Sequence, residues 1–136
     1  METFAHALTR EQCVERLREA TVGRIAVTHR ALPAIVPVNF TLMGSRLVFR
    51  TEPEGMLARA CDGTVVAFEV DEVSPDGMSG WSVLVIGTAE LLTGSGAIRA
   101  AVTGLTSAVG DRAAQFVAVA VGELSGRAME RTEATG

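Results

Sequence analysis

The sequence predicts a small, mainly β protein, a six-stranded antiparallel β-barrel with a few peripheral helices. Six segments with strand patterns follow one another, separated by turn signals. Helical patterns are too few and too uneven for alternating strand–helix winding. The length of 136 residues suits one domain, 1–136, that buries a sizeable core.

The six strands are recognised by β-branched and aromatic residues that alternate with polar ones. We expect them at residues 23–28, 34–42, 46–51, 65–73, 81–92 and 116–121. Pro37 cannot donate a ladder hydrogen bond, so the second strand should lie at an edge or a bulge. Gly44 and Ser45 form the turn to the third strand, and Gly87 should bend the fifth.

Three segments carry helix signals. Thr9 and Gln12 have the spacing of a capping box, which predicts an N-terminal helix within residues 1–21 that ends near Ala20. A short helix should begin at residues 53–55 and end near Ala60, and a further helix is expected at 97–109. The polar residues 128–136 are expected to form a frayed tail.

Composition excludes several classes of function. The net charge of −4 argues against general binding to nucleic acid or to acidic membranes. All twelve basic residues are arginine, so a P-loop, a pyridoxal-phosphate Schiff base and protein-kinase chemistry are excluded for want of a lysine. With 48% hydrophobic residues, part of the apolar surface is expected in a dimer interface.

The remaining polar residues give weak signals, and we predict neither a metal site nor a catalytic side chain. Glu69 and Asp71 share a strand face, where we expect them to be solvated or paired with arginine. The other candidates lack metal-ligand spacing or a nucleophile context: Cys13, Cys61, His6 and His29. No signal peptide or apolar run of about 20 residues is present, so we expect a cytoplasmic protein.

The most informative stretch is residues 35–57. Arg50 and Thr51 end a strand just before a helix start, where a guanidinium, a hydroxyl and free amides could hold a phosphate. A kinked strand around Pro37 would add an apolar wall and free backbone groups for a flat heterocycle. The alternative is that Arg50 is an ordinary surface arginine.

Over nearly its whole length the chain resembles the FMN-binding split barrels related to pyridoxamine 5′-phosphate oxidase, in their short actinobacterial-type branch. The order and spacing of several segments carry this resemblance, more than any single one. They are 22–27 (VGRIAV), 36–40 (VPVNF), 48–51 (VFRT), 66–71 (VAFEVD), 80–87 (GWSVLVIG), 116–117 (FV) and 126–127 (GR).

The resemblance implies a homodimer that binds FMN at the subunit interface and performs flavin-dependent redox chemistry on an unknown small substrate. It implies that the ring is lined by Val36, Pro37, Val38 and Asn39. Arg50 and Thr51 would hold the phosphate beside the helix start at Met56 and Leu57. Trp81 and Ser82 would approach the flavin from the neighbouring subunit or the facing strand.

Two departures from the family pattern leave alternatives open. Met56 stands where the family usually has a lysine, which suggests a non-catalytic dimeric flavin- or ligand-binding protein with weakened FMN affinity. Residues 95–109 lack the Pro-Trp element of many relatives, and a more open pocket would suit a deazaflavin-dependent reductase. Oxidation of pyridoxamine phosphate is not expected, because we find no second cationic cluster for its phosphate.

Overall fold

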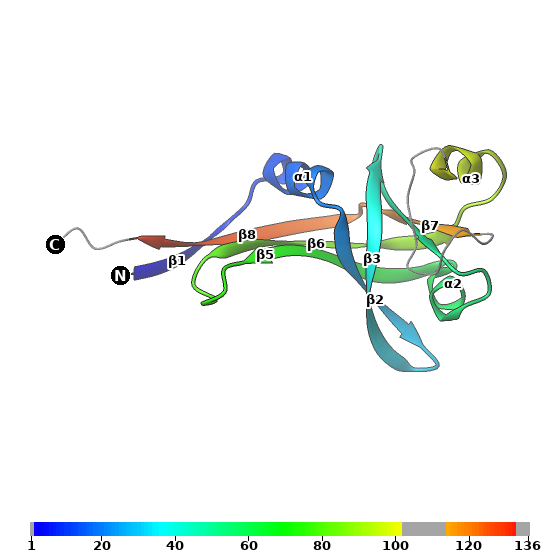
Figure 1. The fold of residues 1–136 in the computed structure, drawn as a ribbon, viewed down its shortest axis with the longest axis horizontal. Helices are drawn as coiled ribbons and strands as arrows, with labels where there is room; N and C mark the ends of the chain where they lie inside the picture. Colours follow the sequence, from blue (N-terminus) through cyan, green and yellow to red (C-terminus); the bar gives the residue numbers. More distant parts are fainter. Residues whose placement is uncertain (1, 102–113, 133–136) are drawn as a thin grey trace.

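The computed structural model describes residues 2–101 and 114–132 (Figure 1). Their strands are β1 (Glu2–Ala7), β2 (Val22–His29), β3 (Leu32–Met43), β4 (Arg46–Thr51), β5 (Thr64–Val73), β6 (Gly80–Leu91), β7 (Gln115–Ala120) and β8 (Glu123–Thr132). The helices are α1 (Arg10–Glu19), α2 (Met56–Cys61) and α3 (Gly94–Ala101).

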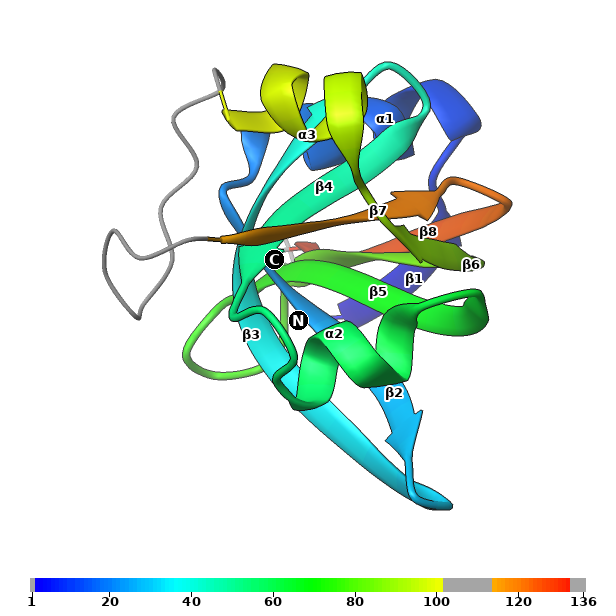
Figure 2. The ribbon, with the colours of Figure 1, turned by 90° about the vertical axis from the view of Figure 1, so that its right-hand side faces the viewer.

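Six of these strands form a closed antiparallel barrel, which confirms the predicted fold. The strand order is β6-β5-β2-β3-β4-β7, and pairing of β6 with β7 closes the ring. α2 lies across one end of the barrel, and α3 lies against β7 (Figure 2). The observed barrel strands differ from the predicted ones by no more than two residues at either end.

Two further strands extend the sheet beyond the barrel. β8 pairs with the first half of β6, and β1 pairs with β8 at the outer edge (Figure 1). The predicted frayed tail is therefore wrong for residues 128–132, which belong to β8; residues 133–136 lie outside the described residues. Ala7 of β1 pairs with Arg127 of β8. Because the two strands are so far apart in the sequence, a local residue pattern cannot predict that they pair.

The N-terminal helix is shorter than the predicted segment. Residues 2–7 form β1, and the helix begins at Arg10 after the expected cap. The Thr9 hydroxyl accepts from the Gln12 amide at 3.1 Å, and the Thr9 amide donates to Gln12 Oε1 at 2.9 Å, which confirms the capping box.

The other two helices also differ from prediction. The second begins at Met56, and α3 ends at Ala101, while residues 102–109 of the predicted third helix lie outside the described residues. In the part of the chain that the structure describes, every helix is too short or too polar to cross a membrane.

The main core fills the barrel. The rings of Phe40 and Phe68 meet edge to face with centroids 4.9 Å apart. Leu57 and Cys61 bring one side of α2 into this core, and Cys13 and Leu17 bring in α1. A smaller cluster lies beneath α3 and is made of Val48, Leu92, Ala100, Phe116 and Ala118. Because the core lies inside the ring, alternate side chains of each barrel strand point outward.

Candidate functional site

One edge of β3 is open beside the predicted site. Residues 32–39 pair with β2 alone, because β4 joins β3 only from Phe40 onward. Within the described chain, the backbone groups along this edge therefore face no second strand. This confirms the expectation that Pro37 lies at an edge, where its missing N–H costs no ladder bond.

Side chains of this segment alternate between core and surface. Val38 is only 9% exposed and lies in the core, and Val36 packs against it half-buried. Pro37 and Asn39 are exposed on the outside of the barrel. A flat molecule lying on this edge would therefore meet the backbone together with Pro37 and Asn39.

The end of β4 lies next to this edge. Phe40 pairs with Phe49, so the register places Asn39 and Arg50 next to each other where the two strands separate. Phe40 and Phe49 both point into the core, which puts Asn39 and Arg50 together on the outer face. The structure thus brings the two predicted segments, residues 36–39 and 50–51, to one place.

Arg50 is held more firmly than an ordinary surface arginine. Its side chain is half-buried with a buried Nε, beside Phe116 in the register of β4 and β7. Thr51 is half-buried and pairs with Gln115. A guanidinium with a partly buried stem keeps a defined direction, as a binding site for an anion requires.

α2 follows β4 after a tight turn. Glu54 has a φ of 61°, and the Gly55 amide donates to the Glu52 carbonyl at 3.3 Å. Met56 is half-buried at the start of the helix, and Leu57 is 8% exposed in the main core. The side chain of Leu57 therefore supports the barrel, and only its backbone is available to a ligand.

The turn also carries two carboxylates that were not predicted to belong to the site. Glu52 follows Thr51 directly, Glu54 lies two residues further on, and both are exposed. Their position shortly after Arg50 and Thr51 was the feature of the sequence that could have placed them near the site. A negative charge here opposes binding of a phosphate, although exposure to water screens the effect.

Trp81 and Ser82 lie at a different part of the sheet. Ser82 on β6 pairs with Asp71 and Arg127, and β5 and β2 lie between β6 and β3, so about 14 Å separates this part of β6 from the open edge of β3. The Trp81 ring lies under the guanidinium of Arg16 on α1, 4.7 Å from the ring centroid. Ser82 points to the outer face, which also carries Pro37, whereas Trp81 points to the opposite face, so one chain does not bring this pair together at the β3–β4 site.

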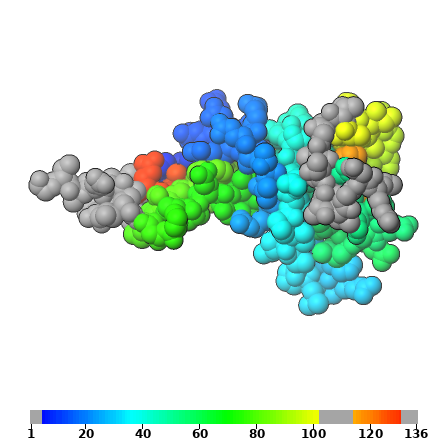
Figure 3. Space-filling view, in the orientation of Figure 1, coloured from blue at the N-terminus to red at the C-terminus, as the bar shows by residue number. Residues whose placement is uncertain are grey.

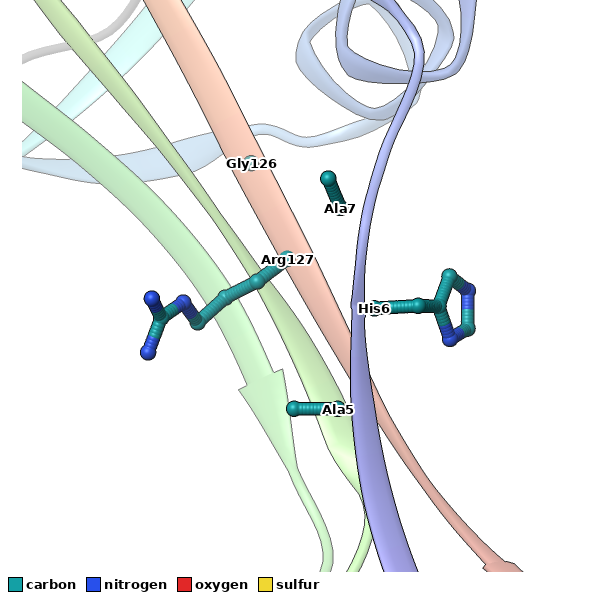
Figure 4. Close-up of a pocket in the computed structure, with 5 residues that line it drawn as sticks. All are labelled: Ala5, His6, Ala7, Gly126 and Arg127. Atoms are coloured by element: carbon teal, nitrogen blue, oxygen red, sulfur yellow. The ribbon is translucent and has the colours of Figure 1, made fainter.

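Two pockets lie near this end of the sheet. One of about 100 Å³, mostly apolar, is lined by Val73, Ser79, Gly80, Trp81, Ser82, Arg127 and Met129. The other, of about 210 Å³, lies between β1 and β8 (Figure 4). In it Arg127 and His6 point to opposite sides of the sheet, so its polar side chains do not converge on a ligand.

The acidic pair on β5 confirms the expectation of pairing with arginine. Arg24 Nη1 on β2 lies 3.1 Å from Glu69 Oε1 and 2.7 Å from Asp71 Oδ2. Burial, followed by the neighbouring Asp71 carboxylate, raises the pKa of Glu69 to about 7. The pKa of Asp71 is lowered, chiefly by its interaction with Glu69. The two carboxylates therefore titrate as one interacting pair, and the raised pKa of Glu69 places the uptake of the first proton near neutral pH.

No group of three or more metal-ligating side chains occurs within residues 2–101 and 114–132. The cysteines Cys13 and Cys61 are separate, buried and free. Arg50 and Thr51 beside the open edge of β3 form an arrangement that is suited to holding an anionic planar molecule.

Several known proteins are similar to this chain. The family model described as pyridoxamine 5′-phosphate oxidase matches residues 9–128. A Mycobacterium tuberculosis protein, Rv0080, is 37% identical over 87 residues, which are 60% of this chain and 57% of that protein. The chain therefore spans little more than half the length of this curated relative.

Two solved structures share the fold. A Corynebacterium glutamicum protein with a proposed pyridoxamine 5′-phosphate oxidase activity is 28% identical, with a TM-score of 0.78 over 98% of this chain and 99% of the other. An FAD-binding protein from Mycobacterium smegmatis is 25% identical, with a TM-score of 0.71 over 92% and 98%. The chain belongs to the pyridoxamine 5′-phosphate oxidase family of split barrels.

Proposed function

We propose that this protein binds a flavin at the separation of β3 and β4 and uses it as an oxidoreductase on a small substrate. The observation that carries the proposal is the placement of half-buried Arg50 and Thr51 beside the open edge of β3. A bound flavin would supply the redox chemistry, and the residues of the chain would bind and orient it.

The phosphate is assigned to the end of β4. The Arg50 guanidinium can donate two parallel hydrogen bonds to phosphate oxygens, and the Thr51 hydroxyl can donate a third. α2 has only six residues, so we ascribe little of the binding to its dipole. Arg50 is therefore the principal phosphate-binding residue of the proposal.

The ring is assigned to the open edge of β3. An isoalloxazine presents carbonyl and N–H groups along one edge, and the unpaired backbone of residues 33–39 can match them. Pro37 and Asn39 provide exposed side chains on the same side. The proposed ring and phosphate positions are adjacent because Asn39 on β3 lies opposite Arg50 on β4.

Two flavin cofactors, FMN and FAD, are candidates for this site. The sequence resemblance predicts FMN, whereas the M. smegmatis relative is described as an FAD-binding protein. Both cofactors share the ring and the first phosphate, so the same residues would hold that common part. The adenylate of FAD would need further contacts, which a comparison of affinities can detect.

Self-association is part of the proposal. On the outer face, the exposed fractions of Ile35 and Leu84 are 70% and 40%, so the described part of the chain leaves both side chains open to solvent. This face also carries charges of both signs, so a second copy can cover it by symmetry. Ser82, which is on the same face, could then approach the flavin of the partner.

Titration of the purified protein, stripped of co-purified ligand, tests flavin binding. FMN, FAD, riboflavin and a deazaflavin cofactor are added separately, and flavin fluorescence is followed. We expect FMN or FAD to bind more tightly than riboflavin, which lacks the phosphate. Arg50→Gln should weaken FMN about 10- to 100-fold and leave riboflavin unchanged, because one charge-assisted contact is lost.

Arg46→Gln is the matched control. Arg46 lies on the same strand, but its Nη1 pairs with Glu90 Oε1 at 3.0 Å, away from the site. Equal losses in the two variants would contradict the role of Arg50. Failure to bind any flavin would refute the proposed function.

Turnover separates an enzyme from a flavin carrier. The loaded protein is mixed with NADH or NADPH without oxygen, and loss of the oxidised flavin absorbance is recorded. Reduction faster than that of free flavin supports an oxidoreductase. A bound flavin that nicotinamide reduces no faster than free flavin favours the alternative of a non-catalytic carrier.

A further inference from the structure

The outer face of the sheet has a charged cluster at its centre. One row across the strands runs Pro37, Arg24, Glu69, Leu84 and Ser125, from β3 to β8. The neighbouring row runs Ile35, Ala26, Ala67, Ile86 and Glu123. The apolar Leu84, Ala67 and Ile86 therefore border Glu69, and the polar Ser82 lies opposite Asp71, on a face that is open to water.

The groups that face Glu69 can be named from each neighbouring strand. β2 contributes Arg24, and β5 itself contributes Asp71. β6 contributes Ser82, Leu84 and Ile86, which do not ionise near neutral pH, and β3 contributes Pro37 and Asn39 beyond Arg24. Beyond β6, β8 carries Arg127 and Glu123 at the margin of the face.

The cluster is not neutral when both acids are ionised. One guanidinium then faces two carboxylates, which leaves a net charge of −1. The side chains of Arg24, Glu69 and Asp71 are 53%, 34% and 23% exposed, so water still solvates the excess charge. Covering the face would remove that water, and two copies would bring two such charges into one interface.

We propose that the Arg24–Glu69–Asp71 cluster links self-association of this protein to protons, so that a second copy binds to the outer face more tightly when Glu69 is protonated. This inference rests on the self-association in the proposed function, and it does not depend on flavin. Protonation of Glu69 makes the cluster neutral and removes repulsion between the copies. A pKa of about 7 for Glu69 places the change near physiological pH.

The direction follows from linkage. Association takes up protons, so the dissociation constant should fall as the pH is lowered through the pKa of the free subunit. If both copies hold Glu69 protonated in the dimer, the dissociation constant should be about 100-fold lower at pH 6 than at pH 8. If part of Glu69 stays ionised in the dimer, the ratio of the dissociation constants at pH 8 and pH 6 should be smaller.

Energy transfer between labelled subunits measures this response. The chain contains no lysine, so its α-amino group is the only primary amine and accepts a donor or an acceptor dye selectively. The two preparations are mixed and diluted at pH 6 and at pH 8. The dissociation constant is obtained from the loss of energy transfer on dilution, and the rate of subunit exchange is recorded at each pH.

Glu69→Gln is the informative variant, because glutamine keeps the shape and can still accept from Arg24. We expect its dissociation constant to change less than about threefold with pH and to be lower than the wild-type value at pH 8. Glu90→Gln is the matched control, since Glu90 also pairs with an arginine, Arg46, but away from this face. It should keep the full wild-type response.

Leu84→Glu tests the surface itself. Leu84 is 40% exposed, so a charge there is tolerated by the fold but should prevent association at both pH values. Unimpaired association of this variant would show that copies meet elsewhere. A wild-type constant and exchange rate that do not change with pH, a stable monomer at both pH values, or a response that survives in Glu69→Gln would each overturn the inference.

The flavin titration keeps the two proposals separate. A protein that associates in this proton-dependent way but takes up no flavin would refute the proposed function and leave this inference intact. A protein that binds flavin but whose self-association does not depend on pH would support the proposed function and refute this inference.

Discussion

Met56 occupies the position at which the sequence resemblance predicts a lysine. It is the first residue of α2, half-buried, and it packs against the barrel core. A lysine at this position could extend its ammonium past the helix start towards a phosphate held by Arg50. The present chain has one cation fewer there, and it also has the carboxylates of Glu52 and Glu54 nearby in sequence.

We therefore expect Met56→Lys to tighten binding of FMN about tenfold, because it adds one charge-assisted contact to the phosphate. The affinity for riboflavin should not change. Met56→Gln has a similar length without the charge and is the control. If both variants bind FMN as the wild type does, position 56 does not limit affinity.

The candidate site was partly predictable at the level of residues. Alternation along β3 and the placement of Arg50 at a strand end were readable from sequence, and the structure brings them together. Whether Arg50 binds a phosphate stays a prediction. The separation of Trp81 from Ser82 also follows from strand alternation, but the stacking of Arg16 on Trp81 depends on how α1 packs.

Among the elements, the β2–β3 hairpin has an unusual turn. His29 pairs with Leu32, so Arg30 and Ala31 form a two-residue loop, with φ values of 51° and 66°. Such turns favour glycine or asparagine, because a Cβ is strained in the left-handed region. The hairpin projects from the body of the molecule (Figures 1 and 3), and its tip carries the exposed Leu32.

Ala31→Gly should stabilise the protein by about 1 kcal/mol, because it removes this strain. Urea unfolding at constant protein concentration measures the change. Ala34→Gly is the control in the same strand, where the backbone is extended. It should destabilise by at least about 0.5–1 kcal/mol, since glycine there adds freedom to the unfolded chain and removes a methyl group that packs against the core. Equal signs in the two variants would contradict this account of the turn.

Elements with a clear residue pattern of their own were predictable, and those that depend on a distant partner were not. The β3–β4 hairpin was expected from Gly44 and Ser45, and it forms with Met43 opposite Arg46. β1 and β8 were both missed, because β1 pairs with β8 from the opposite end of the chain and β8 pairs with the distant β6. Neither segment has enough apolar alternation to indicate a strand by itself.

At the scale of the whole molecule, β6 joins two structures. Its first half pairs with β8 in the extended sheet, and its last residues pair with β7 to close the barrel. The change of partner falls at Gly87, where the sequence predicted a bend. The connection between β7 and β8 passes so close here that a Cβ on Gly87 would overlap the carbonyl oxygen of Ala120.

Gly87→Ala should therefore weaken the closure of the barrel and the attachment of β8 together. The obstacle is backbone, which cannot move aside as a flexible side chain does, so we expect a loss of about 2–3 kcal/mol in the free energy of unfolding. Gly96→Ala is the control, because a Cβ there would lie 3.6 Å from Leu92 Cδ2 in ordinary contact. Because Gly96 lies inside α3, that change should raise the free energy of unfolding by about 0.5–1 kcal/mol.

Urea unfolding followed by Trp81 fluorescence measures the stability of both variants. If Gly87→Ala does not fold at all, the loss of stability exceeds the total stability of the protein, which also agrees with the prediction. A Gly87→Ala protein as stable as the wild type would show that β7 and β8 can separate from β6 without cost, and the two halves of the sheet would then not be coupled through this residue.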